Sequence, residues 1–319
     1  MKKYLCLFAV LGLLMACTPE KKEVVATAIK LNKNELTIQK GANETLIVTF
    51  TPSDVTEKTL VWVSSDKNVA EVTDGVVVGV DAGSTEIIVK HGNLTDKCTV
   101  KVTVPFTLEA VDLGLSVKWA NANLGANAPE DYGDYYAWGD VEPYYSSQNP
   151  LIWKEGKTGY NWASYKWCNG SNYDNLTLAK YNTSALYGTI DNKTDLDAED
   201  DAAHVKLGGK WRMPTSGEVD ELVTTRLHSK KHKWEWKSIN GHNGWLVTYL
   251  ENNNSIFLPA TGARNRDNLS GDGGNGLYWN SSLFSENPRQ AWGIYFTSSS
   301  VSRGSQSRCA GQAVRPVSD

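Results

Sequence analysis

The run Cys98-Thr99-Val100-Lys101-Val102-Thr103-Val104 alternates apolar with polar residues, and Pro105 follows it. A period of two is the pattern of a half-buried β-strand. Working outward, the same alternation occurs upstream in the ranges 28–31, 35–39, 45–50, 60–64 and 87–90. Glycines, prolines and an Asp-Gly pair separate these runs, as expected between short strands. About seven short strands in roughly 80 residues is typical of a β-sandwich, so residues 24–104 are predicted to form an all-β sandwich.

The composition changes at Pro105. Between residues 18 and 104 the aromatic residues are Phe50 and Trp62, and there is no Arg. All other Trp and all Arg residues of the chain lie beyond position 105. A chain of 319 residues is long enough for two ordinary domains. We therefore predict a second domain over residues 105–319.

Ordered motifs in residues 24–104 resemble the bacterial Ig-like domain of group 2. The matching segments are Leu36-Thr37-Ile38-Gln39-Lys40-Gly41, Thr51-Pro52-Ser53-Asp54, Val61-Trp62-Val63-Ser64-Ser65-Asp66, Val69-Ala70, Gly79 and Ala82-Gly83. The resemblance implies an Ig-like sandwich of the kind found in bacterial surface adhesins, acting as a spacer. Direct ligand binding by this module is the alternative, and its scarcity of aromatic residues argues against it.

The N-terminus has the organisation of an export signal. Lys2 and Lys3 precede twelve apolar residues, too few for the ~20 that cross a bilayer. The ending Leu14-Met15-Ala16-Cys17 resembles a bacterial lipobox. This implies a signal peptide over residues 1–16, a lipid on Cys17, a tether over residues 17–23, and an outer-membrane lipoprotein at the cell surface. The alternative is an ordinary signal peptide with an incidental cysteine.

Charge and cysteine usage narrow the function further. The formal net charge of -4 argues against nucleic acid as a partner. Because an exported chain permits disulfides, Cys168 and Cys309, both in the C-terminal part, are the predicted pair. Cys98 lies in a strand pattern and is predicted to be a buried small hydrophobe. The sequence has no Cys-x-x-Cys, which excludes a zinc or redox site of that type.

Residues 106–319 combine short strands with two helical patterns. The range 197–207 has acids in its first turn and stops at Gly208-Gly209. Thr215 and Glu218 have the spacing of a capping box before a second helix. Strands are predicted over 245–250, 255–259, 293–297 and 313–316, which together with the helices gives an α+β domain.

The same region resembles the Fibrobacter succinogenes major paralogous domain, which is common in Bacteroidetes lipoproteins and is related to the C-type lectin-like fold. The segments that carry the resemblance are residues 112–120, 123–126, 130–139, 200–204, 208–215 and 312–317. Trp211-Arg212-Met213-Pro214-Thr215 is also similar to a segment of formylglycine-generating enzymes. The first family has no well-defined activity, so the resemblance implies a fold more than a function.

An enzyme would need reactive groups in a suitable pattern. Formylglycine-generating enzymes depend on paired reactive cysteines, and Cys168 and Cys309 lie outside any such motif. His228, His232 and Glu235 come near a metal motif, but intervening lysines would repel a cation, and a solvated basic run at a helix end is the competing interpretation. No metal, cofactor or enzymatic activity is expected.

The segment 264–280, RNRDNLSGDGGNGLYWN, is the most site-like part of the chain. The late loop region carries ligand contacts in C-type lectin-like folds. The candidate contacts, here and in the following strand, are Arg264, Asp267, Asp272, Asn275, Tyr278, Trp279 and Trp292. Carboxylate and amide oxygens can take sugar hydroxyls or a cation, and glycines permit close backbone approach. The Glu-Pro-Asn and Trp-Asn-Asp motifs of calcium-dependent lectins are absent. A mobile polar loop, and core positions for the tryptophans, are the alternatives.

These observations together favour a lipoprotein in which an Ig-like spacer presents a C-type lectin-like head that binds a glycan or a surface protein. A structural subunit of a surface assembly, such as a fimbrial tip, is the first alternative. An enzyme related to formylglycine-generating enzymes is the second.

Overall fold

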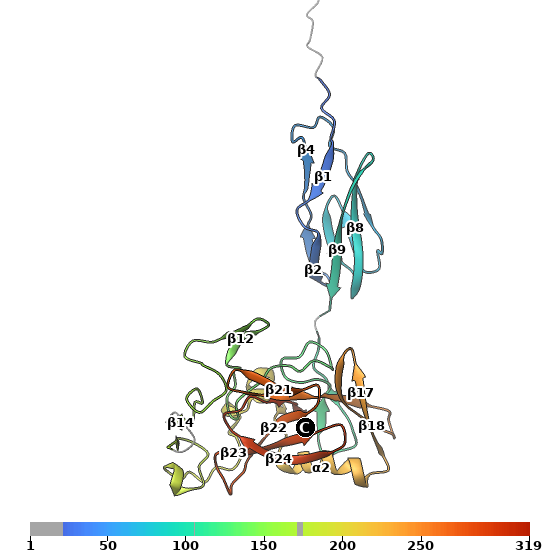
Figure 1. Cartoon of the computed structure of the whole chain (residues 1–319). Coiled ribbons are helices and arrows are strands. Elements are labelled where there is room, and N and C mark those ends of the chain that lie inside the picture. The colour runs from blue at the N-terminus through green and yellow to red at the C-terminus, as the bar shows by residue number, and fades with distance from the viewer. Residues whose placement is uncertain (1–21, 105, 171–174) are drawn as a thin grey trace, which may run out of the picture. The chain divides into compact units, whose positions relative to one another are not determined.

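The computed structural model describes residues 22–104, 106–170 and 175–319, and Figure 1 traces the chain. The predicted signal peptide, Cys17 and the tether up to residue 21 lie outside the described residues. Contacts divide the chain into two compact units, residues 1–105 and 106–319. Within the described ranges, no helix is both long and apolar enough to cross a membrane.

The N-terminal unit consists of strands, as its alternating sequence predicts (Figure 1). Four strands form one sheet in the order β2-β9-β8-β5, three form another in the order β3-β7-β6, and β1 pairs with β4. Only β2 and β9 pair in parallel among these strands. The strands are β1 (Ala28–Leu31), β2 (Glu35–Gln39), β3 (Asn43–Thr45), β4 (Val48–Thr51), β5 (Val61–Ser64), β6 (Ala70–Thr73), β7 (Val76–Gly79), β8 (Gly83–His91) and β9 (Leu94–Thr103).

Alternate side chains of these strands form one hydrophobic core. Ile87 and Val89 of β8 and Cys98 and Val100 of β9 are fully buried, and Cys98 is the buried small residue that the sequence predicts. The predicted strand over 45–50 divides into β3, which pairs with β7, and β4, which pairs with β1, and the intervening Leu46 is buried in the core, 2% exposed. The chain therefore changes sheets at this residue.

The β6–β7 hairpin turns on two residues with left-handed backbone conformations. Asp74 has φ 48° and Gly75 has φ 84°. Two-residue hairpin turns favour this conformation because it matches the strand twist, and an Asp-Gly pair adopts it readily. A Cβ on Gly75 would lie 2.7 Å from the carbonyl oxygen of Leu46, so only glycine fits this position.

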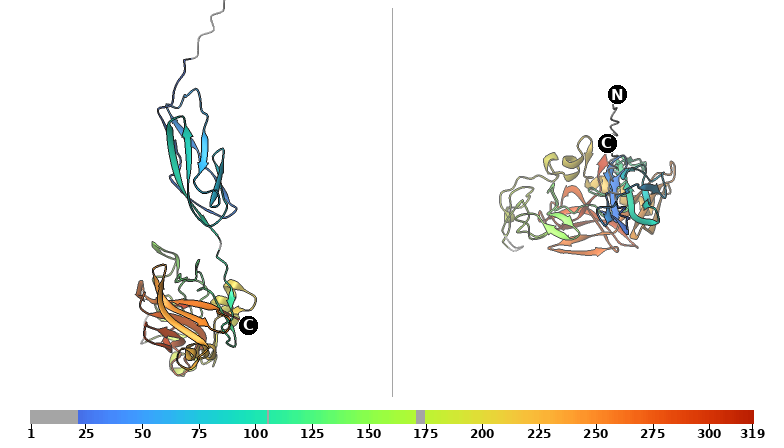
Figure 2. Two further views of the ribbon diagram at one scale, coloured as in Figure 1. Left: turned by 90° about the vertical axis from the view of Figure 1, so that its right-hand side faces the viewer. Right: turned by 90° about the horizontal axis from the view of Figure 1, so that it is seen from above.

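The C-terminal unit is mainly β, with few helices, so strands account for more of it than the α+β prediction implied (Figures 1 and 2). Its largest sheet has the order β21-β20-β22-β23-β24, with β25 also paired to β22. Two further sheets have the orders β17-β18-β19 and β10-β11-β26-β16, and β12-β13 and β14-β15 are separate hairpins.

The strands of this unit are β10 (Ala110–Val111), β11 (Lys118–Ala120), β12 (Tyr145–Gln148), β13 (Leu151–Trp153), β14 (Cys168–Asn169), β15 (Thr177–Leu178), β16 (Trp211–Arg212), β17 (His232–Ile239), β18 (His242–Tyr249), β19 (Ser255–Pro259), β20 (Thr261–Asn265), β21 (Asn268–Asp272), β22 (Gly276–Leu283), β23 (Gln290–Phe296), β24 (Val301–Ser307), β25 (Ala313–Val314) and β26 (Val317–Ser318). The helical segments are η1 (Ala185–Tyr187), η2 (Ala198–Asp200), α1 (Ala202–Leu207) and α2 (Ser216–His228).

The first predicted helix is shorter than expected because of Asp201. A 3-10 turn, η2, precedes Asp201, and α1 follows it. The Asp201 carboxylate accepts hydrogen bonds from the backbone N–H groups of Ala203, His204 and Met213. This N-cap starts a new helix at Ala202 and also holds the strand β16 close to it.

The second predicted helix is confirmed with its cap. The Thr215 hydroxyl accepts from the Glu218 N–H, and the Glu218 carboxylate accepts from the Thr215 N–H, which completes the capping box. The Arg212 guanidinium also binds the Glu218 carboxylate through both Nη atoms, at 2.8 and 2.7 Å. The Trp211–Thr215 motif thus fixes the start of α2.

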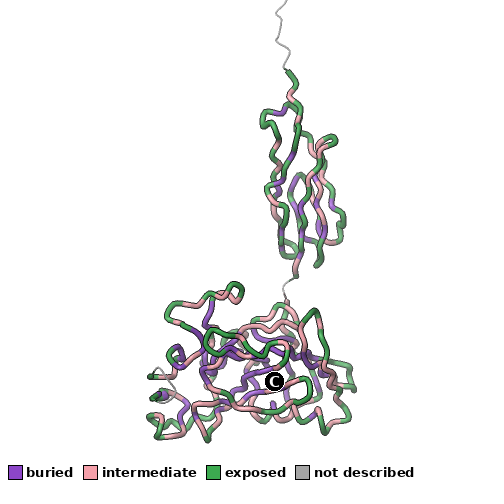
Figure 3. The backbone as a smooth tube through the Cα atoms, viewed as in Figure 1, coloured by how far each residue is buried: buried purple, intermediate pink, exposed green. Residues whose placement is uncertain are grey.

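Figure 3 shows stretches of buried backbone inside the C-terminal unit, and many of the motif residues are buried. Trp119, Trp138 and Tyr136 belong to its hydrophobic clusters, each at most 2% exposed. Two fully buried arginines, Arg308 and Arg315, bind acceptors that are mostly backbone carbonyls. The conspicuous polar and aromatic motifs therefore build the scaffold of this unit.

Candidate binding surface

The site-like segment 264–280 is a β-hairpin that leads into a core strand, and not a mobile loop. Strands β20 and β21 pair antiparallel, with Arg264 opposite Leu269 and Asn265 opposite Asn268. Arg266 and Asp267 make the turn, and Arg266 has φ 57°. Polar and apolar or small residues alternate in this segment, and a strand with one exposed face tolerates that pattern.

Other parts of the unit hold the hairpin at several points. Arg266 and Tyr160 exchange backbone hydrogen bonds of 2.9 Å each way, and Arg264 and Gly311 do the same at 2.8 and 2.9 Å. Gly159 allows the first contact, because a Cβ there would lie 2.7 Å from the carbonyl carbon of Arg266. Because these bonds hold the hairpin backbone at β20 and the turn, this part of the backbone has less conformational freedom to lose on binding.

The two faces of the hairpin differ in character. Asn265, Asn268, Ser270 and Asp272 share the outer face and are exposed, and we call these four residues the polar strip. Arg264 and Leu269 share the inner face, where Leu269 packs against a cluster of tyrosines and tryptophans. The polar strip offers amide, hydroxyl and carboxylate groups, which are suited to hydrogen-bond a polyhydroxylated ligand.

Two predicted ligand contacts are core residues instead. Tyr278 and Trp279 in β22 are 0% and 1% exposed. The Tyr278 hydroxyl donates to the Pro259 carbonyl, and Trp279 Nε1 donates to the Tyr136 carbonyl at 2.8 Å. Strand β22 is central in its sheet and is covered on both faces, so neither side chain is open to a ligand.

The predicted oxygen ligands do not converge on one point. Asp267 is in the turn and Asp272 is at the far end of β21, five residues away and therefore about 16 Å along an extended strand. Asn275 follows Asp272 in the next turn, where its N–H donates to the Gly271 carbonyl. One cation could not take Asp267 and Asp272 together.

Trp292 is half-buried on β23 and is already engaged. Its ring stacks edge-on with Phe284 at 4.7 Å, and the Arg303 guanidinium lies 4.3 Å from its centroid. Arg303 also binds the Asp220 carboxylate of α2 at 2.6 Å. This arrangement leaves little free aromatic face, so Trp292 fits a packing position better than a platform for a sugar.

Arg264 is the predicted contact whose environment is unusual. It is 6% exposed, and its guanidinium lies 5.1 Å and 5.4 Å from the ring centroids of Tyr135 and Tyr145. Its Nη2 is 3.4 Å from Gln148 Oε1, a long contact, and its Nε is buried without a hydrogen-bond partner. No carboxylate of the described residues lies within ion-pair distance of it.

Asp134 lies on the other side of the Gln148 side-chain amide from Arg264. Gln148 Nε2 donates to the Gly133 carbonyl at 2.9 Å and reaches Asp134 Oδ1 at 3.4 Å, and the Tyr145 hydroxyl donates to that oxygen at 3.1 Å. Burial raises the pKa of the Asp134 carboxyl, although the bonds from Tyr145 and Gln148 oppose the rise. Gln148 therefore separates a buried cation from a half-buried acid.

The sequence analysis did not identify Gln148 or Asp134 as site residues. The signal for Asp134 was present, because the acidic and aromatic run 131–140 is conspicuous. In the structure, Tyr136 and Trp138 of this run are core residues, whereas Asp134 is half-buried. The sequence carries no local signal for Gln148, because its contact with Arg264 joins residues 116 positions apart.

The predicted bridge between Cys168 and Cys309 is not formed in this structure, where both are free thiols. Burial raises the pKa of the Cys309 thiol to about 11, with Ser307 hydrogen-bonded to it. Both cysteines contribute to the same aromatic cluster, in which Cys309 is buried and Cys168 is partly buried. Their role in the structure is packing.

The possible histidine pair is also separated. Helix α2 ends at His228, and His232 begins the strand β17, so the two rings do not share a helix face. His232 Nε2 donates to the Leu113 carbonyl at 2.7 Å, and its Nδ1 lies 2.8 Å from Ser229 Oγ. Both ring nitrogens of His232 are thus occupied by structural hydrogen bonds.

A compact acidic group occurs at Asp197, Glu199 and Asp200, whose oxygens lie within 4.8 Å of one another. The ammonium of Lys180 occupies their midst, 2.6 Å from Asp197, 3.6 Å from Glu199 and 2.5 Å from Asp200. Lys166 reaches Asp200 from another side at 2.9 Å. The protein thus supplies its own cations to this group.

We expect the stability of the C-terminal unit to fall when Asp197 is protonated. Hydrogen bonds from Lys180 and Lys193 lower the pKa of Asp197 to about 2. A depressed carboxyl pKa stabilises the fold above the unfolded value of about 4 and loses that effect as the pH falls toward 2. The urea midpoint should therefore decline between pH 4 and pH 2, and Lys180→Met should flatten this decline. An unchanged slope in that variant would contradict the assignment.

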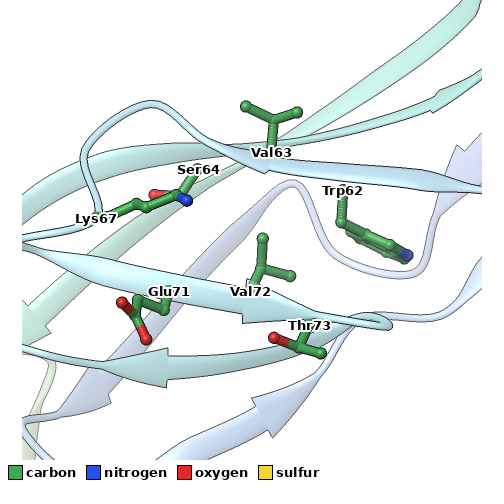
Figure 4. Close-up of a pocket in the computed structure, with 7 residues that line it drawn as sticks. All are labelled: Trp62, Val63, Ser64, Lys67, Glu71, Val72 and Thr73. Atoms are coloured by element: carbon green, nitrogen blue, oxygen red, sulfur yellow. The ribbon is translucent and has the colours of Figure 1, made fainter.

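The N-terminal unit has a groove of about 300 Å³ between β5 and β6, the end strands of their two sheets. Figure 4 shows Trp62 and Val72 extending into the space between these strands, while Val63 points away from it. Lys67 and Glu71 bring opposite charges to its rim. The groove is shallow and mixed in character, and it offers no set of converging polar groups.

Comparison with known proteins assigns the N-terminal unit. Residues 25–102 match the model of the bacterial Ig-like domain (group 2). An uncharacterized protein of Clostridium acetobutylicum is 36% identical over 84 residues, which is 25% of this chain and 9% of that protein. An alpha-L-arabinofuranosidase of Bifidobacterium longum is 38% identical over 80 residues, 25% of this chain and 7% of that protein. The chain spans less than a quarter of the length of the curated relatives that it matches.

Among solved structures, the chain is similar to domains 4 and 5 of the S-layer protein SbsC, with 26% identity and a TM-score of 0.23 over 25% of this chain and 53% of that one. Domains 5 and 6 of the same protein align over 91% of this chain and 97% of that one, with 13% identity and a TM-score of 0.24. These scores are too low to carry an argument about either unit. The sequence match and the strand arrangement agree for the first unit alone, and residues 25–102 are a bacterial Ig-like domain of group 2.

Proposed function

We propose that this protein is a cell-envelope lipoprotein in which the Ig-like domain is a spacer and the C-terminal unit is a non-catalytic binding head for glycans. The single observation that carries the proposal is the β20–β21 hairpin. Its residues Arg264 and Arg266 are bonded to Gly311 and Tyr160, and it exposes the amide, hydroxyl and carboxylate groups of the polar strip. A rigid polar display of this kind is suited to ligands rich in hydroxyl groups.

Two further features support this proposal. Many aromatic residues and arginines of the motifs are buried, so they stabilise the fold and are not open to a ligand. A ligand would therefore be bound by the surface hairpins. The lipobox-like ending at Cys17 provides the envelope anchor that a surface receptor needs, and membrane lipid is the partner at that end. A C-type lectin-like fold for residues 105–319 is part of the proposal and rests on the motif resemblance.

A structural subunit of a surface assembly is the second candidate, and one observation favours it. Val61 and Val63 on the end strand β5 are 56% and 39% exposed. Exposed apolar edge strands can pair with a neighbouring chain. An assembly subunit would use this edge, whereas a receptor would use the C-terminal hairpin.

Array binding of the full chain tests the proposal. We expect reproducible binding to a restricted set of glycans, unchanged by a calcium chelator because Asp267 and Asp272 are too far apart to share an ion. Extracellular-matrix proteins on the same arrays serve as the comparison class. No binding to any glycan, together with recovery of the protein in a stable envelope complex, would contradict the receptor and favour the assembly subunit.

A further inference from the structure

Three arginines of the C-terminal unit are buried, and one of them lacks the partners that the other two have. Arg308 places four hydrogen bonds, on Tyr165 and on the carbonyls of Tyr181, Pro288 and Lys180. Arg315 places three, on Asn123 and on the carbonyls of Ala120 and Phe257. Arg264 has a single long contact of 3.4 Å with Gln148, and its buried Nε–H has no acceptor.

This difference matters because a buried charge without acceptors is costly. Burying a charged group is unfavourable unless it is paired and hydrogen-bonded. Cation–π attraction to the rings of Tyr135 and Tyr145 offsets part of the cost of burying the Arg264 charge. The rings do not accept hydrogen bonds from the N–H groups, which point outward in the plane of the guanidinium. An anion from outside would supply what Arg308 and Arg315 obtain from the protein itself.

The position of Gln148 indicates which anion fits. Its side-chain amide is planar, like a carboxylate, and its Oε1 occupies the place where a ligand oxygen would meet Nη2. Gln148 is half-buried at the end of β12, and the exposed Asn149 follows it. A carboxylate that displaced this amide could bind the guanidinium through two parallel hydrogen bonds, which is stronger than a neutral contact.

Asp134 further restricts the chemical class of the ligand. Its half-buried carboxylate is adjacent to the same amide, at 3.4 Å from Gln148 Nε2. An acidic peptide side chain would be repelled by Asp134 without giving it a hydrogen bond. A sugar acid carries hydroxyl groups beside its carboxylate, so it can satisfy Arg264 and donate to Asp134 at once.

We propose that Arg264, with Gln148 beside it and Asp134 next to Gln148, is a binding site for the carboxylate of an acidic sugar such as a uronic acid. The site lies on the inner face of the same hairpin that carries the polar strip. The proposal rests on the glycan-binding function above and specifies the chemical class of the ligand. It requires that the Gln148 side chain move aside, which breaks its long contact with Arg264 and its 2.9 Å hydrogen bond to the Gly133 carbonyl.

The test is calorimetric titration of the full chain with D-glucuronate and, separately, D-glucose. We expect binding of glucuronate, at least tenfold weaker or undetectable binding of glucose, and a loss of at least tenfold in glucuronate affinity for Arg264→Met. Arg264→Lys keeps the charge without the planar fork and should lose part of the affinity. Arg303→Met, which removes an arginine of the same unit that is half-exposed and paired with Asp220, is the matched control and should bind as the native chain does.

Two variants at Gln148 keep the test decisive if Arg264→Met does not fold. Gln148→Glu places a carboxylate in the site and should reduce glucuronate affinity at least tenfold, whereas Gln148→Ala opens the site and should preserve it. Equal affinity for glucose and glucuronate, or unchanged affinity in Gln148→Glu and Arg264→Met, would overturn the acidic-sugar site. A short poly-glutamate peptide that binds as well as glucuronate would overturn the sugar assignment. Binding of neutral glycans on the arrays without dependence on Arg264 would leave the receptor function standing and refute this inference alone.

Discussion

Replacing Trp279 with alanine is expected to destabilise the C-terminal unit by about 3–5 kcal/mol, as for other fully buried tryptophans. The side chain is 1% exposed in the central strand β22, and it contacts a cluster formed with Trp138, Leu283 and Val314. The substitution would leave a large cavity and would remove one of two hydrogen bonds to the Tyr136 carbonyl, which would keep only the bond from the Gln312 N–H. Urea denaturation followed by tryptophan fluorescence measures the effect, since the N-terminal unit contributes only Trp62.

Trp292→Ala is the matched control. Trp292 is half-buried and is the tryptophan of the adjacent strand β23, so its removal should cost about 1–2 kcal/mol. The pair of variants separates the two interpretations of Trp279. A Trp279→Ala chain that unfolds at the native urea concentration but no longer binds glycans would mean that Trp279 is a ligand contact and that its buried position is wrong.

Replacing Arg308 with methionine is expected to cost at least about 3 kcal/mol, because each buried acceptor left unsatisfied costs about 1–3 kcal/mol. Arg308 is fully buried and joins three segments, through the Tyr165 hydroxyl, the carbonyls of Lys180 and Tyr181, and the carbonyl of Pro288. Lysine cannot restore these bonds, since its ammonium lacks the planar fork. Arg308→Lys should therefore be nearly as unstable as Arg308→Met.

The control for Arg308 is again Arg303→Met. Arg303 pairs with Asp220 at the surface, where ion pairs contribute about 0–1 kcal/mol. Fluorescence-monitored unfolding should thus separate the two arginine variants by at least about 2 kcal/mol. Similar midpoints for Arg308→Met and Arg303→Met would contradict a structural role for the buried guanidinium.

The sequence was most informative where one residue pattern has one structural solution. The period-two runs predicted β1 and β2 with their observed bounds, and the Thr215–Glu218 spacing predicted the capping box of α2. These features depend on neighbours within a few residues, which a single sequence displays. The composition change predicted a boundary at the position where the contacts divide the chain.

The site could be predicted only in part, because exposure is a property of tertiary packing. Tyr278 and Trp279 look like ligand contacts in a glycine-rich polar segment, but they lie in β22, which pairs with strands on both sides. The sequence predicts Arg264 as a ligand contact. The class of ligand proposed for it depends on Gln148, which is 116 residues away in the sequence. Helix 197–207 was expected to be continuous because nothing local indicates that the Asp201 carboxylate would bind Met213.

The most direct test of the central claim is the affinity of the full chain for its strongest array glycan, compared with that of an Asn268→Ala, Ser270→Ala, Asp272→Ala variant. These three residues belong to the polar strip and are exposed, so the fold should be retained, as circular dichroism and the urea midpoint would verify. The account predicts at least a tenfold loss of affinity in this variant. Unchanged affinity with an intact fold would contradict the claim that the β20–β21 hairpin is the binding surface.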